Sequence, residues 1–489
     1  MSTTESHATK VSSGRAVADV AVQIGGQGVN ILLGIVTTVV IVRALGADRY
    51  GQWATILATT QLVAMFGNLG LENVAVRFAA QDPEREGSWV AAATGLQVLI
   101  SVPIMLAFLI VLVLIAADTE MLIAGVVLSA LNLTAAIATL RVVFRLRVHN
   151  RVPILFGLVN GVLWAAAVIA IAAANGGLIA FAIAFLAIAV VTQGGIALVA
   201  LRTMPVHWRG SRHLWRRLIG VGISVGIAAT LTFAYGKVDQ ILLYELAPNP
   251  SEVGIYAAMY KILENAGFIP AAVMTTLFPI MAGLHPRQPE RLKRIMHLAI
   301  DYLIIVALGA LGLTLAAATP IVELLFGSAY ASGSAVLTIL MAAFVPICVG
   351  YVAGNMIIAT DQQRRYIWFA AIGLVLNLAA NAILIPIDGM HAAAWVTLAT
   401  EVTVVGLALH TVLRSVGMRL DLRRLAAIAL AAAVAAALVW GLRQAGAGAI
   451  PLVIAMTVLY PLALFGSGTV DREELRQLIR TRRAPRPVA

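Results

Sequence analysis

Residues 157–185 read GLVNGVLWAAAVIAIAAANGGLIAFAIAF, and they lie within a run, 152–201, that contains no charged side chain. A membrane-spanning helix needs about 20 consecutive apolar residues, so this run is long enough for two crossings. The triplet NGG at 175–177 marks the turn between the two helices. Residues 87–117 and 324–360 are likewise free of charge. The sequence therefore predicts an all-α integral membrane protein.

The composition of the whole chain leads to the same class. Of its 489 residues, 61% are hydrophobic and only 12% are charged, and the mean hydropathy is +0.94. A soluble protein of this size carries about 25% charged residues, so too little polar surface remains here to face water. Cys348 is the only cysteine, so no disulfide within the chain is expected.

The apolar runs predict about fourteen membrane-spanning helices, of which the last two are extra helices at the C-terminal end. Their expected positions are 17–42, 51–79, 88–116, 121–145, 152–174, 178–201, 215–246, 253–283, 295–318, 333–359, 365–385, 390–413, 424–441 and 448–466.

Basic residues alternate between the two sides of the membrane that these helices define. One side, with both termini, holds 29 of the 34 Lys and Arg residues, and the opposite side holds 3. By the positive-inside rule, both termini are expected to be cytoplasmic in a cell inner (plasma) membrane. The same bias explains the formal net charge of +11 as contact with anionic membrane lipids, so we expect no nucleic-acid partner.

Two parts of the chain resemble each other at a distance of six helices. The opening stretch resembles GLVLNLAANAILIPIDGMHAAAWVTLA (373–399), and YGQWATIL (50–57) resembles VGIYAAMY (253–260). Six spans return the chain to the same side, so such repeats are parallel and related by an axis along the membrane normal. The repeat predicts two six-helix lobes with a cleft between them. The expected boundaries are a cytoplasmic tail 1–16, an N-lobe 17–208, a C-lobe 209–415, extra helices 416–466 and a basic cytoplasmic tail 467–489.

The connections between the helices disfavour several other functions. The outer connections are short, and no extramembrane domain or cluster of histidines and carboxylates accompanies them. There is no Gly-Lys-Ser/Thr phosphate-binding loop, and GGQG at 25–28 lies inside a span, where close helix packing explains it better. We therefore expect no cofactor, no metal and no catalytic residue.

Ionisable side chains occur inside the predicted spans 215–246 and 253–283. Each costs on the order of 2.5–3.5 kcal/mol at membrane depth, so it needs a partner or water. Lys237 and Asp239 are two residues apart and point in different directions, so Asp239 needs a partner on another helix. Lys261 and Glu264 are spaced to pair within their helix.

Further polar residues lie in spans of both expected lobes, and we expect all of them to surround one shared aqueous cavity. Structural hydrogen bonds between helices are an equally good explanation for each Asn and Gln. The chain has only 4 Lys against 30 Arg, and two of those lysines lie inside the membrane, which favours a site that binds and releases an anion. The expected substrate-binding residues are Lys237, Lys261, Tyr256, Tyr260, Gln23, Gln27, Asn30, Gln240, Asn265, Asn377 and Asn381. The expected ion-coupling or charge-compensating residues are Asp239, Glu264, Glu72 and Glu401.

An ordered set of segments resembles the oligosaccharide flippases, the polysaccharide-exporting branch of the multidrug/oligosaccharidyl-lipid/polysaccharide superfamily. The segments are RALGADRYGQW (43–53), FGNLGLENVAVRF (66–78), KVDQILL (237–243), EVGIYAAMYKILE (252–264), FGSAYASGSAVLTIL (326–340) and LNLAANAILIPIDGMHAAAWVTLATE (376–401). The resemblance covers about residues 15–415, and it implies a V-shaped transporter of two six-helix lobes that works by alternating access. Some members carry an acid where this chain has Asn68, so the coupling ion is not implied.

The resemblance implies that the protein moves a lipid-linked oligosaccharide of the polyprenyl diphosphate type from the inner to the outer leaflet. It implies an H⁺ or Na⁺ counter-ion and association with the machinery of polysaccharide synthesis and export. Lys237 and Lys261 would attract the diphosphate, and Tyr256 and Tyr260 would stack on sugar rings. The alternatives are a multidrug/cation antiporter, a flippase for the peptidoglycan precursor, a glycan-modifying membrane enzyme, and a scaffold that transports nothing.

Overall fold

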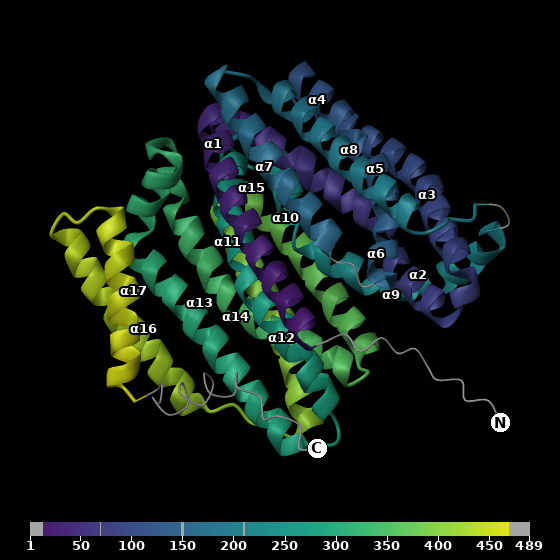
Figure 1. Ribbon diagram of the computed structural model, residues 1–489. Coiled ribbons are helices and arrows are strands. Elements are labelled where there is room, and N and C mark those ends of the chain that lie inside the picture. The colour runs from purple at the N-terminus through teal and green to yellow at the C-terminus, as the bar shows by residue number, and fades with distance from the viewer. Residues whose placement is uncertain (1–12, 69, 148–150, 209–210, 469–489) are drawn as a thin grey trace. The chain divides into compact units, whose positions relative to one another are not determined.

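The protein is helical throughout the part of the chain that the computed structural model describes, residues 13–68, 70–147, 151–208 and 211–468 (Figure 1). Side chains are described from residue 25 onward, except at 67–69, 148–150, 209–211, 223–225, 228–229 and 469–489. The α-helices are α1 (Ser13–Asn68), α2 (Leu71–Gln81), α3 (Glu86–Ile115), α4 (Thr119–Ser129), α5 (Leu131–Ala138), α6 (Val142–Leu146), α7 (Arg151–Ala173), α8 (Leu178–Thr203), α9 (Trp215–Tyr235), α10 (Val238–Leu246), α11 (Ser251–Ala266), α12 (Phe268–Leu284), α13 (Pro289–Phe326), α14 (Ser334–Ala359), α15 (Gln363–Val416), α16 (Leu422–Gln444) and α17 (Ala449–Gly466). Four short 3₁₀ helices join them: Pro83–Arg85, Thr139–Arg141, Ser211–Leu214 and Ser328–Gly333.

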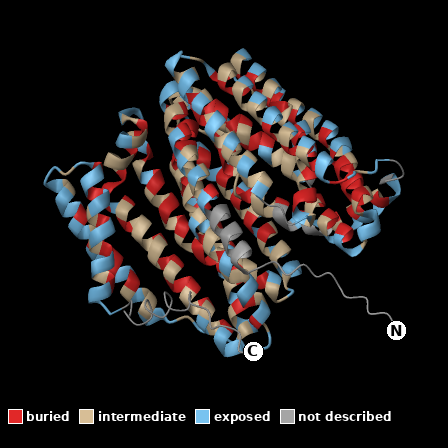
Figure 2. Cartoon of the chain, viewed as in Figure 1, coloured by how far each residue is buried: buried red, intermediate tan, exposed pale blue. Residues whose placement is uncertain are grey.

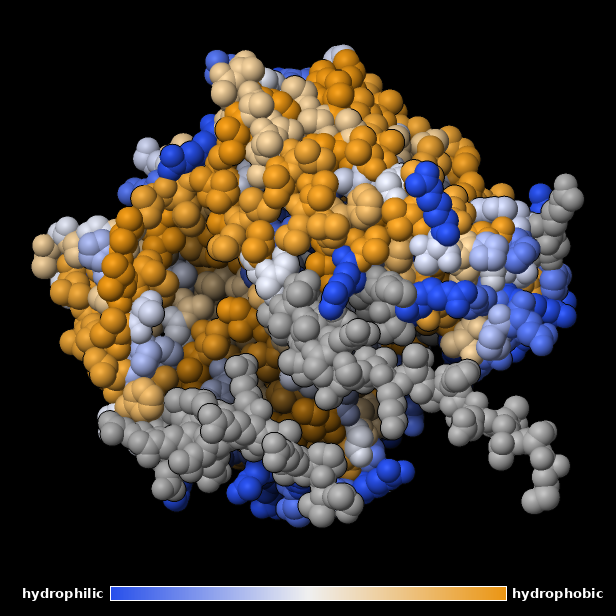
Figure 3. Space-filling view, in the orientation of Figure 1, coloured by the Kyte–Doolittle hydropathy of each residue, from blue (hydrophilic) through white to orange (hydrophobic). Residues whose placement is uncertain are grey.

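Eleven helical segments of the described residues are long and apolar enough to cross a membrane. Large apolar side chains such as Leu114, Trp368 and Ile387 are exposed on them. The space-filling view accordingly shows apolar side chains over much of the visible face (Figure 3). In lipid this arrangement is favourable, because a helix satisfies its own backbone hydrogen bonds and its apolar side chains face hydrocarbon. The expected all-α membrane fold is confirmed.

Two of the eleven segments are much longer than a bilayer is thick. The 56 residues of α1 would measure about 84 Å as one straight helix, against a hydrocarbon core of about 30 Å. Backbone kinks divide them: Gly46 has φ 70° and ψ 174° inside α1, and Asp388 and Gly389 leave helical geometry inside α15. α15 thus contains the two expected spans 365–385 and 390–413, whereas α1 contains 17–42 and only the first part of 51–79, which continues in α2. The turn inside each long helix is made by a residue type that tolerates positive φ.

The expected continuous span 215–246 is wrong, because the helix breaks at Gly236 and Lys237. α9 ends at Tyr235, α10 begins at Val238, and Lys237 has φ −132° and ψ −20°. Gly236 lowers the helix propensity at this point. The hydroxyl of Tyr260 donates to the Gly236 carbonyl oxygen at 2.6 Å, which satisfies a backbone group that the break releases. The spans 121–145 and 253–283 are also divided, at Ala130 and at Gly267.

The helices form two compact units. The first unit comprises residues 1–45 and 55–233, and the second comprises 46–54 and 234–489. This division differs from the expected lobes 17–208 and 209–415, which remain a prediction. In the first unit, α2, α3, α6 and α8 enclose an apolar core that includes Trp89, Phe144 and Met204. In the second unit, α13 packs on α14, α14 on α15, and α16 and α17 on α13. Buried and exposed residues alternate around the helices (Figure 2).

Candidate functional site

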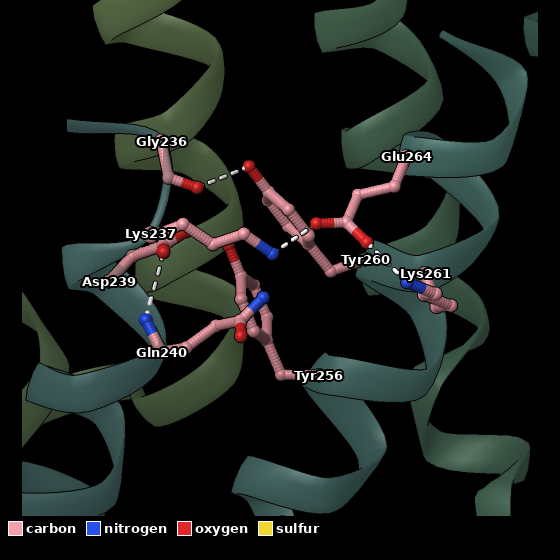
Figure 4. A network of polar contacts seen from close by, with 8 residues as sticks. All are labelled: Gly236, Lys237, Asp239, Gln240, Tyr256, Tyr260, Lys261 and Glu264. Atoms are coloured by element: carbon pink, nitrogen blue, oxygen red, sulfur yellow. Dashed lines mark hydrogen bonds and ion pairs between the residues drawn. The ribbon is translucent and has the colours of Figure 1, made fainter. Parts of the chain in front are cut away.

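The helix break at Gly236 places Lys237 beside α11, where its ammonium forms an ion pair with the Glu264 carboxylate (Figure 4). The other oxygen of the same carboxylate accepts from Lys261 Nζ at 2.9 Å. The expected pairing within the helix is therefore confirmed, and the partner of Lys237 is now known. The side chains of Lys237, Glu264 and Lys261 are 13%, 28% and 43% exposed. Two ammonium groups thus share one carboxylate, which leaves the three residues with a formal charge of +1.

Asp239 lies apart from this pair in a fully buried hydrogen-bond network. Its Oδ2 accepts from the Tyr256 hydroxyl at 2.5 Å and from the Thr397 hydroxyl at 3.2 Å. Its Oδ1 accepts from the backbone N–H of Gln240 at 2.8 Å (Figure 4). The carboxylate therefore links α10 to α11 and α15, as expected for an acid that needed a partner on another helix. Hydrogen bonds to a carboxylate are stronger than neutral ones, so this network fixes the helix that follows the break.

The two tyrosines of α11 support the charged groups in this structure. Tyr256 and Tyr260 lie with their ring centroids 5.7 Å apart, one turn from each other, as their spacing predicts. The Lys237 ammonium lies 5.2 Å from the centre of the Tyr260 ring, a cation–π contact. Tyr256 has no exposed surface and Tyr260 is buried, so neither ring offers a face to a sugar here. In this conformation both hydroxyls form hydrogen bonds within the protein, and the stacking role stays a prediction.

Tyr50 lies near this site, although the sequence analysis did not identify it. It is buried, and it lies close enough to Glu264 and Tyr330 for electrostatic interaction. Residues 46–54 are a short kinked segment near the start of the chain, and their proximity to α11 depends entirely on tertiary structure. In the sequence, only the similarity of residues 50–57 to 253–260 pointed to a relation between this segment and α11.

The remaining expected residues of the second unit fall into three environments. Gln240 is buried, and Asn377 and Asn381 are buried and hydrogen-bonded to each other at 2.9 Å, which favours a structural role. Glu401 is half-buried and lies near Tyr235, Tyr260 and Tyr351. None of the described side chains forms a hydrogen bond or ion pair with it. Asn265 is half-buried.

The expected residues of the first unit lie in other surroundings. Glu72 lines a cavity of about 280 Å³ together with Gln61, Gln97 and Thr139, and this cavity is formed by the first unit alone. Asn30 packs against Gly161, and Gln27 is exposed. The side chain of Gln23 lies outside the described residues. The expectation of one aqueous cavity shared by both lobes therefore remains a prediction.

A family model described as polysaccharide biosynthesis protein matches residues 16–285. The chain belongs to this family. No curated protein matches the chain. Residues 16–285 include Lys237, Asp239 and the whole of α11, so most of the charged site lies within the region that defines the polysaccharide biosynthesis family.

Several solved transporters share the fold of this member of the polysaccharide biosynthesis family. One is "Lipid II flippase MurJ, inward closed conformation", with a TM-score of 0.78 and 11% identity over 93% of this chain and 98% of that chain. A multidrug resistance MATE family transporter in its inward-facing conformation has a TM-score of 0.65 and 14% identity over 79% and 94%. A transporter of the same superfamily from Pyrococcus furiosus, for which a reversed polarity of the binding pocket is described, has a TM-score of 0.60 and 16% identity over 81% and 94%. At these identities the likeness shows the fold, and the fold is that of the superfamily expected from the sequence.

The charged side chains of this site can bind an ionic ligand. Among the described residues no group of three or more His, Cys, Asp or Glu side chains could hold a metal ion. Lys237 and Lys261 present ammonium groups that can attract an anion, and in this structure both pair with the Glu264 carboxylate. Lysine suits this task because its compact ammonium carries three donors on a flexible stem.

Proposed function

We propose that the protein flips a lipid-linked oligosaccharide of the polyprenyl diphosphate type from the inner to the outer leaflet by alternating access. The observation that supports this proposal is the pair of lysines that share Glu264. In a membrane, a partly buried excess positive charge is costly unless a ligand or water compensates it. A diphosphate carries the opposite charge and enough oxygens to replace Glu264 as the acceptor for both ammonium groups.

We further propose that transport is coupled to an H⁺ or Na⁺ gradient. Glu401 is the best candidate for the coupling residue, because it is half-buried and unpaired among the described side chains. Asp239 and Glu264 are held by hydrogen bonds or ion pairs, so they would compensate charge in this conformation. Glu72, which lines the cavity of the first unit, is the corresponding candidate there.

The experiment compares Lys237→Ala and Lys261→Ala with the parent protein, first in cells and then in liposomes that contain only this protein. Both variants should lose surface polysaccharide and flipping of a fluorescent polyprenyl diphosphate oligosaccharide, while their amount in the membrane is unchanged. Lys293→Ala is the matched control, because Lys293 pairs with the exposed Glu290 on α13 and should leave flipping unaltered. Undiminished flipping in both site variants would refute the role of the lysines.

The alternative functions predict different results. A flippase for the peptidoglycan precursor shares the fold, since the MurJ structure superposes over nearly the whole chain, and it would restore growth to a strain depleted of that activity. A multidrug or cation antiporter also shares the fold and would confer drug resistance. A membrane enzyme would change the covalent structure of the glycan, and a scaffold would give no flipping in liposomes.

The proposed setting is a cell inner membrane with both termini in the cytoplasm. The bias of 29 basic residues to 3 supports this orientation. In that setting the substrate arrives from cytoplasmic glycosyl transfer, and the machinery of polysaccharide synthesis and export is the expected partner.

A further inference from the structure

Two cavities lie within the first compact unit, whereas the charged site described above belongs to the second. The larger has a volume of about 280 Å³ and the smaller a volume of about 190 Å³. Gln61 and Ala64 line both of them, so the two cavities are neighbours. Small-molecule sites typically occupy roughly 300–1,000 Å³, so cavities of this size suit a compact group and not a long chain.

The larger cavity is lined by polar side chains that lie in different expected spans of the first unit. Gln61 comes from α1, Glu72 from α2 and Gln97 from α3, and Thr139 begins the 3₁₀ helix before α6. Phe233 of α9 adds an aromatic ring to the lining. Polar groups inside a membrane span are costly unless they pair with each other or contact water or a ligand.

Gln61 and Glu72 are not paired within the protein. Among the described residues, neither side chain forms a hydrogen bond or an ion pair. Arg141 and Arg145 lie within electrostatic reach of Glu72, but their guanidinium groups donate to a glutamine and an asparagine side chain instead. A structural hydrogen bond between helices therefore does not explain why these two residues lie inside the membrane.

The smaller cavity adds an acceptor that lacks a donor. Asn132 of α5 and Thr60 of α1 line it beside Gln61. Asn132 is buried, and its Nδ2 donates to the Ser129 carbonyl oxygen at 3.0 Å. Its Oδ1 is also buried and accepts from no described residue. A buried acceptor without a donor is costly, so a donor from a bound molecule would stabilise this amide.

The charges around the larger cavity favour an uncharged ligand. Glu72 is the one charged side chain among the described residues that line it, so an anion such as a diphosphate would be repelled. A cation would gain little, because the positive charges of Arg141 and Arg145 offset that of Glu72. An uncharged group with many hydroxyls fits better, since the lining amides and hydroxyls both donate and accept hydrogen bonds.

We propose that these cavities bind an uncharged sugar ring of the transported saccharide, with Gln61, Gln97 and Thr139 as its hydrogen-bonding residues. The inference rests on the proposed function for the origin of the saccharide, whereas the site itself belongs to the first unit alone. Glu72 accepts from a sugar hydroxyl in addition to its proposed coupling role. Each unit then recognises a different part of the substrate, the first its sugar and the second its diphosphate.

Protection of a cysteine from alkylation tests the sugar site. The reporter is Ala64→Cys, which removes no polar group from either cavity, combined with Cys348→Ala, which removes the only native cysteine. The protein is held in lipid nanodiscs and labelled with N-ethylmaleimide. The probe is the soluble saccharide that mild acid releases from the polyprenyl diphosphate lipids of the cells that express the protein.

We expect the saccharide at millimolar concentration to slow labelling of the reporter by about threefold or more, because a bound ligand protects the occupied fraction of the protein. No protection would overturn the sugar site. Protection by the cation tetraphenylphosphonium in place of the saccharide would also overturn it and would assign the cavities to cations.

Gln61→Leu in the reporter background should abolish the protection, because it removes the amide that lines both cavities. Gln61 is exposed, so this variant should still elute as a single folded species in gel filtration. Gln363→Leu is the matched control, since it replaces an exposed glutamine of α15 in the second unit and should preserve the protection. Undiminished protection in the Gln61→Leu protein would refute the role given to Gln61.

The lysine variants separate this inference from the proposed function. The released saccharide carries no diphosphate, so Lys237→Ala in the reporter background should leave its protection unchanged. If Lys237→Ala and Lys261→Ala retain full flipping while the saccharide still protects the reporter, the proposed role of the lysines fails and the sugar site stands. If both variants lose flipping while the saccharide gives no protection, the sugar site fails and the role of the lysines stands.

Discussion

The ion pair of Lys237 with Glu264 should stabilise the fold much more than that of Lys261 with the same carboxylate. Lys237 is nearly buried and Lys261 is well exposed, so water screens only the second pair strongly. An exposed pair spaced three residues apart on a helix is worth about 0.2–0.5 kcal/mol. Removing one partner of a fully buried pair costs about 3–5 kcal/mol. Because Glu264 is 28% exposed, we expect about 2 kcal/mol for the pair with Lys237.

Double-mutant cycles measure these two coupling energies. The variants are Lys237→Met, Lys261→Met and Glu264→Gln, together with the two lysine–glutamate double variants. Unfolding of the purified protein is followed by circular dichroism as the denaturing detergent SDS is titrated into mild micelles. The cycle subtracts the effects that each substitution has by itself, so only the pairwise energy remains.

Equal coupling energies, or a larger value for Lys261, would refute the reasoning. Such a result would mean that solvent exposure does not set the strength of these two ion pairs. Near-zero values for both pairs would refute it as well, because the pair with Lys237 would then contribute no stability.

Two further predictions concern other buried polar groups of the second unit. The Asp301 carboxylate is 7% exposed and lies 3.0 Å from the Arg424 guanidinium, so Asp301→Asn should destabilise the protein by about 2–3 kcal/mol in the same SDS titration. The control Glu290→Gln removes an ion pair whose carboxylate is 84% exposed and should hardly change the stability. Similar losses of stability in the two variants would contradict the greater contribution of the buried pair. Tyr256→Phe removes a donor to buried Asp239 and should cost about 1–3 kcal/mol. A stability equal to that of the parent would show that the hydroxyl is dispensable.

The spacing of residues along one helix was enough to predict part of the site. Lys261 and Glu264 pair within α11, and Tyr256 and Tyr260 lie one turn apart, because helix geometry alone fixes those distances. The same geometry predicted that Lys237 and Asp239 would not pair; they do not, although Lys237 lies at the break before α10 and not within a helix. It could not supply their partners, since these come from other helices.

The helix break was the main feature that periodicity could not reveal. The largely apolar stretch from 215 to 246 predicts one span. A glycine within a membrane-spanning helix is common and does not by itself indicate a break. The break is stabilised by the Tyr260 hydroxyl, which approaches the Gly236 carbonyl from a different helix. A residue 24 positions away thus decides the local structure.

The sequence by itself determined that this chain is a bundle of apolar helices with charge placed inside the membrane. Hydrophobic content and charge spacing are local properties, and the cost of exposing polar backbone to lipid leaves few other folds. Tertiary structure alone decided which charges meet and what covers them. Lys237 pairs with Glu264, and Asp239 accepts a hydrogen bond from Tyr256. Tyr50, in residues 46–54, lies near Glu264 because packing brings distant segments of the chain together. The periodicity of the sequence does not specify such contacts, since they depend on which helices pack against each other.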